Sequence, residues 1–181
     1  MINHTHRFVF IHIPKTGGTS LEMAFGYDEK NHHIKHLNAQ NYSYLLGNIF
    51  SEYKKISIIR NPWDRVLSFY IYRKMQNRLP SNVNSFSEWV HFIRHKKGLF
   101  AGIYDYLSND DSICCDLFLN FYNLEEDLGN FCKSQNISLK LPHKNKTKHS
   151  HYTDYYDKDA KEIVAEKYAK DIEYFGYKFG E

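Results

Sequence analysis

The sequence has few cysteines and no long apolar run, and both absences limit what the protein can be. Three of its 181 residues are cysteines, and two of these are the neighbours Cys114 and Cys115. Such a set provides neither a disulfide framework nor a metal-ligand spacing, so a reducing compartment is the simplest interpretation. No segment approaches the roughly 20 apolar residues of a membrane span, and the first residues lack the apolar run of a signal peptide. We therefore expect a soluble cytoplasmic protein without a membrane span.

A large excess of charge is also missing. Lys and Arg number 24 against 21 Asp and Glu, which gives a net charge of +3 with histidine neutral. This excess suits an anionic ligand but is too small to indicate nucleic acid, and we expect no nucleic-acid partner. With 42% hydrophobic and 25% charged residues, the composition is that of a globular protein. The length predicts a single domain over residues 1–181.

Short apolar segments alternate with helix-like segments along the chain. The apolar runs predict strands over 7–13, 54–60 and 116–122. Periodicity and caps predict helices over 19–26, 39–47, Pro62 to Met75, 85–95, 123–134 and 157–175. Two of these helices begin with a capping-box pattern, "SFSE" at 85–88 and "NLEE" at 123–126. The segments 28–37, 96–112 and 136–152 are expected to be mostly irregular. The alternation predicts an α/β, P-loop-like three-layer fold with a central, mainly parallel sheet and helices on both faces.

The stretch "HIPKTGGTS" joins the first predicted strand to the first predicted helix. Ligands of open α/β sheets bind at the carboxyl ends of strands, where a glycine-rich loop lets backbone N–H groups approach an anion and the following helix adds its positive end. A structural turn would need only one glycine, so we interpret the loop as a site for a phosphate-like group. Its candidate residues are Lys15, Thr16, Gly17, Gly18, Thr19 and Ser20.

This loop is not a Walker A loop, in which a glycine precedes the lysine and a neighbouring strand supplies an Asp for Mg²⁺. Here Lys15 precedes both glycines, and the neighbouring strand "KKISIIR" ends in Arg60. An arginine cannot bind a metal, but it binds a phosphate well. A structural ion pair of Arg60 with Asp64 or Glu52 is the alternative.

Together these motifs resemble those of sulfotransferases that use 3′-phosphoadenosine 5′-phosphosulfate (PAPS). "HIPKTGGTS" is similar to their 5′-phosphosulfate loop, and "IIRNPWDRVLSFY" to their 3′-phosphate motif. The more specific resemblance is to the carbohydrate branch with heparan 2-O- and chondroitin 4-O-sulfotransferases. It extends to "KHLNAQNY", "FYNLEEDL", "LPHKNKTKHSHYTDYYD" and "VAEKYAKDIEYFGYKF".

The resemblance implies roles for the donor-site residues. Lys15 would stabilise the leaving oxygen, and residues 16–20 would hold the 5′-phosphate. Arg60 and Ser68 would bind the 3′-phosphate, and no metal would be required. The implied partner is a carbohydrate or other hydroxyl acceptor.

A general base is also needed, and histidine suits this role near neutral pH. His36 lies where the related 2-O-sulfotransferases carry their catalytic histidine, with His32 and His33 as rivals, whereas His12 is expected to be a packed residue. The basic stretch 133–153 is either a solvated loop or a cover for the nucleotide or glycan, and the resemblance makes Lys146 a candidate nucleotide contact.

Two other functions stay open at this point. An ATP-dependent small-molecule kinase would need Mg²⁺ and a Walker-type loop. A non-catalytic nucleotide- or glycan-binding protein could use the same fold.

Overall fold

The chain folds into two compact units. The computed structural model describes residues 1–27, 35–139 and 150–181. The first unit contains the described residues 1–60 and 105–139, and the second contains 61–104 and 150–181. The single domain expected from the length stays a prediction.

The first unit is built on a four-stranded sheet with the order β1–β2–β3–β6. Its strands are β1 (Ile2–Asn3), β2 (Phe8–Ile11), β3 (Lys54–Ile59) and β6 (Leu117–Asn120). The three longer strands run parallel, and only β1 is antiparallel. The mainly parallel sheet confirms the predicted fold class, and it brings the carboxyl ends of β2, β3 and β6 to one edge.

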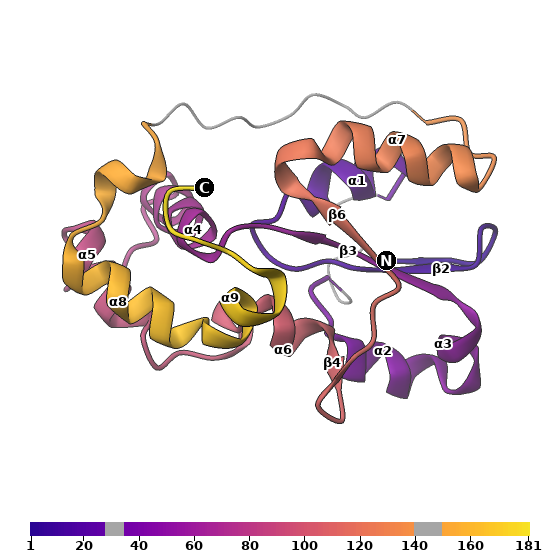
Figure 1. The fold of residues 1–181 in the computed structure, drawn as a ribbon, viewed down its shortest axis with the longest axis horizontal. Coiled ribbons are helices and arrows are strands. Elements are labelled where there is room, and N and C mark those ends of the chain that lie inside the picture. Colours follow the sequence, from indigo (N-terminus) through magenta and orange to yellow (C-terminus); the bar gives the residue numbers. More distant parts are fainter. Residues whose placement is uncertain (28–34, 140–149) are drawn as a thin grey trace. The chain divides into compact units, whose positions relative to one another are not determined.

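Helices cover both faces of this sheet (Figure 1). Helices α1 (Gly18–Ala24) and α7 (Leu124–Ser134) lie on one face, and α2 (Ala39–Leu46) and α3 (Asn48–Glu52) lie on the other. Gly47, with φ of 54°, separates α2 from α3. The predicted helix over 39–47 is therefore confirmed, whereas α3 was not predicted.

Alternating side chains of the strands build a core on each face. Phe8 and Phe10 belong to an apolar cluster with Leu21 of α1 and Phe131 of α7. Because successive side chains of a strand point to opposite faces, Val9 and its alternating neighbours on β2 point to the other face, where they are equally buried. Each face of β2 is therefore apolar, as expected of a central parallel strand.

The second unit is helical. Its helices are α4 (Pro62–Met75), α5 (Phe86–Ile93), α8 (Lys158–Lys167) and α9 (Ala169–Phe175). They surround a core that includes the buried Trp89, which is 1% exposed. The start of α4 is as predicted, with Pro62 in its first turn and the Asn61 side chain accepting from the N–H of Trp63.

Several details differ from the sequence prediction. The single helix expected over 157–175 is broken at Tyr168, whose φ is −112° and whose hydroxyl donates to the carbonyl of Phe100. The expected capping box at Asn123 is wrong, because no side-chain hydrogen bond is formed by this residue at the start of α7. Ser85 does accept from the N–H of Glu88, as predicted for α5.

The segment 96–112 is more regular than predicted. It contains a short 3₁₀ turn, helix α6 (Ile103–Leu107), and the hairpin formed by β4 (Ser108–Asn109) and β5 (Ser112–Ile113). These elements have only two to five residues, which is too short for periodicity to reveal them.

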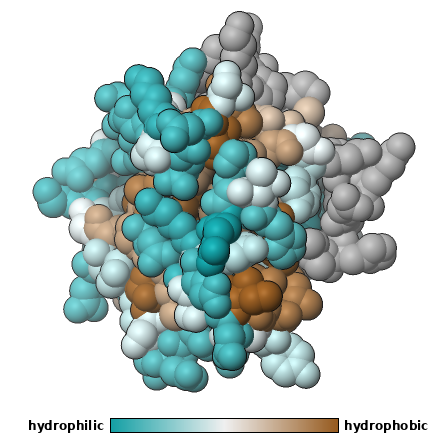
Figure 2. Space-filling view, turned by 90° about the vertical axis from the view of Figure 1, so that its right-hand side faces the viewer, coloured by the Kyte–Doolittle hydropathy of each residue, from teal (hydrophilic) through white to brown (hydrophobic). Residues whose placement is uncertain are grey.

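The described surface is mixed in character. On the face shown in Figure 2, hydrophilic side chains surround smaller hydrophobic patches. Within residues 1–27, 35–139 and 150–181, no helix has the length and hydrophobicity needed to cross a membrane.

Candidate active site

Two predicted anion-binding residues meet at the carboxyl ends of neighbouring strands. Lys15 follows β2, Arg60 follows β3, and the strands pair in parallel. Arg60 is 7% exposed, and its guanidinium donates to the carbonyl oxygen of Lys15 at 2.8 Å. The sheet therefore places two cationic residues side by side, as the sequence indicated. Glu52, one alternative partner of Arg60, pairs with Arg7 at 2.8 Å.

The ammonium group of Lys15 lies in a poorly hydrated and positive environment. Burial, together with the charge of Arg60, lowers the pKa of Lys15 from 10.5 to about 8. Its backbone φ is 67°, in the left-handed region that non-glycine residues rarely adopt. Its backbone is thus strained, and an anion bound beside it would favour the protonated form of its side chain.

The loop after Lys15 is shaped by its two glycines. Gly17 has φ of 90°, which favours glycine. Gly18 has no room for a side chain, since a Cβ there would lie 2.4 Å from Cδ2 of His12. The hydroxyl of Thr16 donates to the carbonyl of Ile13 at 2.8 Å, so this proton is already used within the loop. Thr19 and Ser20 are partly exposed.

Phe121 is a residue of this site that the sequence analysis did not identify. It follows β6, the third parallel strand, and the guanidinium carbon of Arg60 lies 3.9 Å from the centre of its ring. A Cβ on Gly17 would lie 3.3 Å from the same ring. Phe121 thus packs against both the loop and Arg60. Its position directly after a parallel strand was the signal that could have indicated it.

His36, the predicted base, lies close to the same loop. Its Nδ1 is 2.9 Å from the carbonyl oxygen of His12, and the two imidazole rings are 4.4 Å apart. A carbonyl only accepts, so Nδ1 carries the proton and Nε2 keeps its lone pair. Burial, followed by the neighbouring His12, lowers the pKa of His36 to about 4. The ring is therefore neutral at neutral pH and available as a proton acceptor.

The remaining predicted residues lie in the second unit or outside the described residues. Ser68 is half-buried on α4 in the second unit. Lys146 and the rival histidines His32 and His33 lie outside the described residues. His12 is 3% exposed, in agreement with the expectation of a packed histidine.

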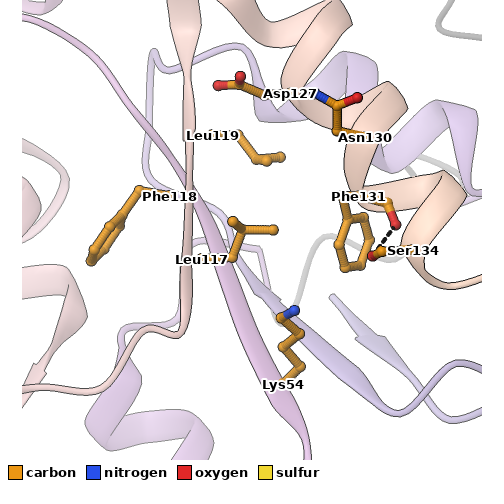
Figure 3. Close-up of a pocket in the computed structure, with 8 residues that line it drawn as sticks. All are labelled: Lys54, Leu117, Phe118, Leu119, Asp127, Asn130, Phe131 and Ser134. Carbon is orange, nitrogen blue, oxygen red and sulfur yellow. Dashed lines mark hydrogen bonds between the residues drawn. The ribbon is translucent and has the colours of Figure 1, made fainter.

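A pocket in the first unit lies apart from these residues. Figure 3 shows Leu117 and Leu119 pointing from β6 toward α7, while Phe118 points to the other side of the strand. The pocket has a volume of about 330 Å³, and its lining also includes Lys54, Asp127, Asn130, Phe131 and Ser134. None of the predicted site residues belongs to this lining. In the part of the chain that the structure describes, no group of three or more His, Cys, Asp or Glu residues is arranged to hold a metal ion.

The fold is that of mixed α/β proteins, with a cationic loop at the carboxyl end of a parallel sheet. The chain belongs to the sulfotransferase family, whose model matches residues 1–178. The crystal structure of mouse sulfotransferase SULT7A1 complexed with PAP is similar in fold, with a TM-score of 0.61 and 14% sequence identity. The match covers 92% of this chain and 86% of the mouse chain. No curated protein matches the sequence.

Proposed function

We propose that the protein transfers a sulfuryl group from PAPS to a hydroxyl of a carbohydrate-type acceptor. The observation that carries the proposal is the hydrogen bond between Arg60 and the carbonyl of Lys15, because it joins the two predicted anion-binding motifs at adjacent strand ends. Membership of the sulfotransferase family and the PAP complex of the mouse enzyme support it. The carbohydrate acceptor rests on the resemblance to the heparan 2-O- and chondroitin 4-O-type enzymes.

The residues present fit a donor with separate anionic groups. The backbone of residues 16–20 would bind the 5′-phosphate, since Gly17 and Gly18 leave the loop without side chains at its centre. Arg60, held by Phe121 and by the Lys15 carbonyl, would bind the 3′-phosphate. Ser68 and Lys146 are further proposed contacts. The donor supplies the sulfuryl group together with a nucleotide phosphate as the leaving group.

Two side chains would act on the reacting atoms. Lys15 would place its ammonium group at the leaving oxygen and stabilise the negative charge that develops there. His36 would accept the acceptor's hydroxyl proton at Nε2, because its Nδ1 is already bonded to the His12 carbonyl. Such a mechanism depends on positioning and electrostatics and needs no metal ion.

Thermal unfolding with alternative nucleotides tests the donor assignment. We expect 3′,5′-adenosine bisphosphate, without metal, to raise Tm, since ligand at a hundred times its Kd stabilises the native state by about 2.7 kcal/mol. For a chain of this size the shift is roughly 5–10 °C. Adenosine 5′-monophosphate is the matched control, because it lacks the group that Arg60 would bind and should produce a smaller shift.

Stabilisation by ATP with Mg²⁺ alone would contradict the proposal and favour a kinase. With the donor established, transfer of ³⁵S from labelled PAPS to heparan- or chondroitin-type oligosaccharides tests the acceptor class. Loss of this transfer in His36→Ala, with bisphosphate binding retained, is the result expected of a general base.

A further inference from the structure

His12 connects the donor loop to the proposed base. Its ring is buried against Gly18 so closely that a Cβ there would lie 2.4 Å from Cδ2 and 2.6 Å from Nε2. Its backbone carbonyl accepts the Nδ1 proton of His36. A displacement of His12 would therefore change the packing against Gly18 and the hydrogen bond to His36.

Glu22 of α1 contacts a different part of the His12 ring. Gly18 lies against Cδ2 and Nε2, whereas Glu22 contacts Nδ1. Its Oε1 lies 2.8 Å from Nδ1 of His12, although the N–H direction is not aligned well enough for a linear hydrogen bond. Burial raises the pKa of the Glu22 carboxyl, but His12 and Lys35 outweigh it and the net pKa is lowered. Burial likewise lowers the pKa of His12. At neutral pH the contact thus joins a carboxylate to a neutral imidazole.

The same carboxylate also reaches the segment that carries the proposed base. Oε2 of Glu22 lies 3.8 Å from Nζ of Lys35, the residue directly before His36. Glu22 is only 13% exposed and Lys35 19%, so this ion pair is less screened than one at the surface. The Glu22 side chain therefore contacts both Lys35, which precedes His36 in the sequence, and His12, whose carbonyl is the hydrogen-bond partner of His36.

The backbone conformation of His36 also depends on its neighbours. Its φ of 67° lies in the left-handed region, which few residues with a side chain adopt, although histidine does so more often than most. Among the described non-glycine residues with positive φ, four are Asn or Asp, which tolerate this conformation, and the others are Arg7, Lys15 and His36.

We propose that Glu22 is a positioning residue that, through His12 and Lys35, holds His36 in the tautomer with Nδ1 protonated and Nε2 open to the acceptor. The inference rests on the proposed function, since His36 is a base only if sulfuryl transfer occurs. A purely structural role would instead affect stability while leaving the tautomer and turnover of the folded enzyme unchanged.

The test compares Glu22→Ala and Glu22→Gln with Glu52→Ala. Glu52 is the matched control, because it belongs to the same unit and forms an exposed ion pair with Arg7. Three quantities are measured on the full chain: kcat with saturating PAPS, the Kd of 3′,5′-adenosine bisphosphate, and the His36 tautomer. Imidazole ¹H–¹⁵N NMR reports the tautomer, with the His36 signals assigned from a His36→Ala spectrum.

We expect Glu22→Ala to lower kcat by about 100-fold, the effect of a misplaced catalytic group. The loss in kcat should exceed any weakening of bisphosphate binding, and the Nε2-protonated form of His36 should appear. Glu22→Gln keeps an acceptor for His12 but loses the charge that faces Lys35, so its loss should be intermediate. It also provides the test if Glu22→Ala does not fold. Glu52→Ala should match the wild type.

Wild-type kcat and tautomer in both Glu22 variants would overturn the inference, as would a loss confined to bisphosphate binding. Failure of the proposed function is distinguishable, because the wild type would then transfer no sulfuryl group. The tautomer comparison needs neither donor nor acceptor, so it would still show whether Glu22 orients His36.

Discussion

At the scale of single residues, the lowered pKa of Lys15 predicts that binding of the proposed donor depends on pH. Burial and Arg60 lower this pKa to about 8, and a bound anion favours the protonated form. The affinity for 3′,5′-adenosine bisphosphate should therefore be full below pH 8 and fall as the pH rises through that value, by up to about tenfold per pH unit. Isothermal titration calorimetry at several pH values measures it.

Lys15→Arg is the matched control for this prediction. Arginine keeps its proton throughout this range, so the variant's affinity should change much less with pH. A wild-type Kd that stays constant to one unit above the pKa of Lys15 would show that the ammonium group does not face the ligand.

Phe121 allows a second test at this scale. Its ring supports the Arg60 guanidinium at 3.9 Å, a contact of about 0.5–2 kcal/mol. Phe121→Leu should weaken bisphosphate binding by roughly 2- to 30-fold, whereas Phe121→Tyr should retain it. Phe50→Leu makes the same change at a buried position on α3 and should leave the Kd unaltered. If the Phe121→Leu protein and the wild type bind the bisphosphate with equal affinity, Phe121 does not contribute to bisphosphate binding.

At the scale of elements, α9 stabilises the start of α6 through one buried carboxylate. Asp171 is 1% exposed, and its two oxygens accept from the N–H groups of Ile103 and Tyr104, each at 2.8 Å. Asp171→Ala would leave both donors unpaired, so the free energy of unfolding should fall by roughly 2–5 kcal/mol. Urea denaturation measures this change.

The exposed Glu173 on the same helix is the control, and Glu173→Ala should change the free energy by less than about 0.5 kcal/mol. An equally small effect of Asp171→Ala would mean that water or a shifted backbone replaces the lost acceptor.

The elements also show what the sequence could predict. The strands β2 and β3 were predictable because "FVFI" and "KKISII" are short, apolar and β-branched. The break at Tyr168 was not, since residues on either side continue the helical pattern and the hydroxyl bond to Phe100 depends on tertiary structure. Likewise, the N–H of Asn120 donates to the carboxylate of Asp127, seven residues later. No sequence pattern of helix caps predicts this hydrogen bond.

At the scale of the whole molecule, the order of the strands explains why the site was partly predictable. Lys15 and Arg60 could be predicted as neighbours because each follows an apolar strand, and parallel strands end at the same edge. Phe121 and Glu22 were not predicted, and His12 was expected only as a packed residue, since their contacts cross between separate elements. The sheet order β1–β2–β3–β6, which local patterns do not contain, brings Phe121 to Arg60.

The two glycines of the loop after β2 look equivalent in the sequence, but they constrain its evolution differently. Gly17 is required by its own backbone angle, whatever its neighbours are. At Gly18 the constraint includes the ring of His12, and this steric part of the constraint disappears once a smaller residue replaces that histidine. Among related sequences, position 18 should therefore covary with position 12, whereas position 17 should stay glycine in each background.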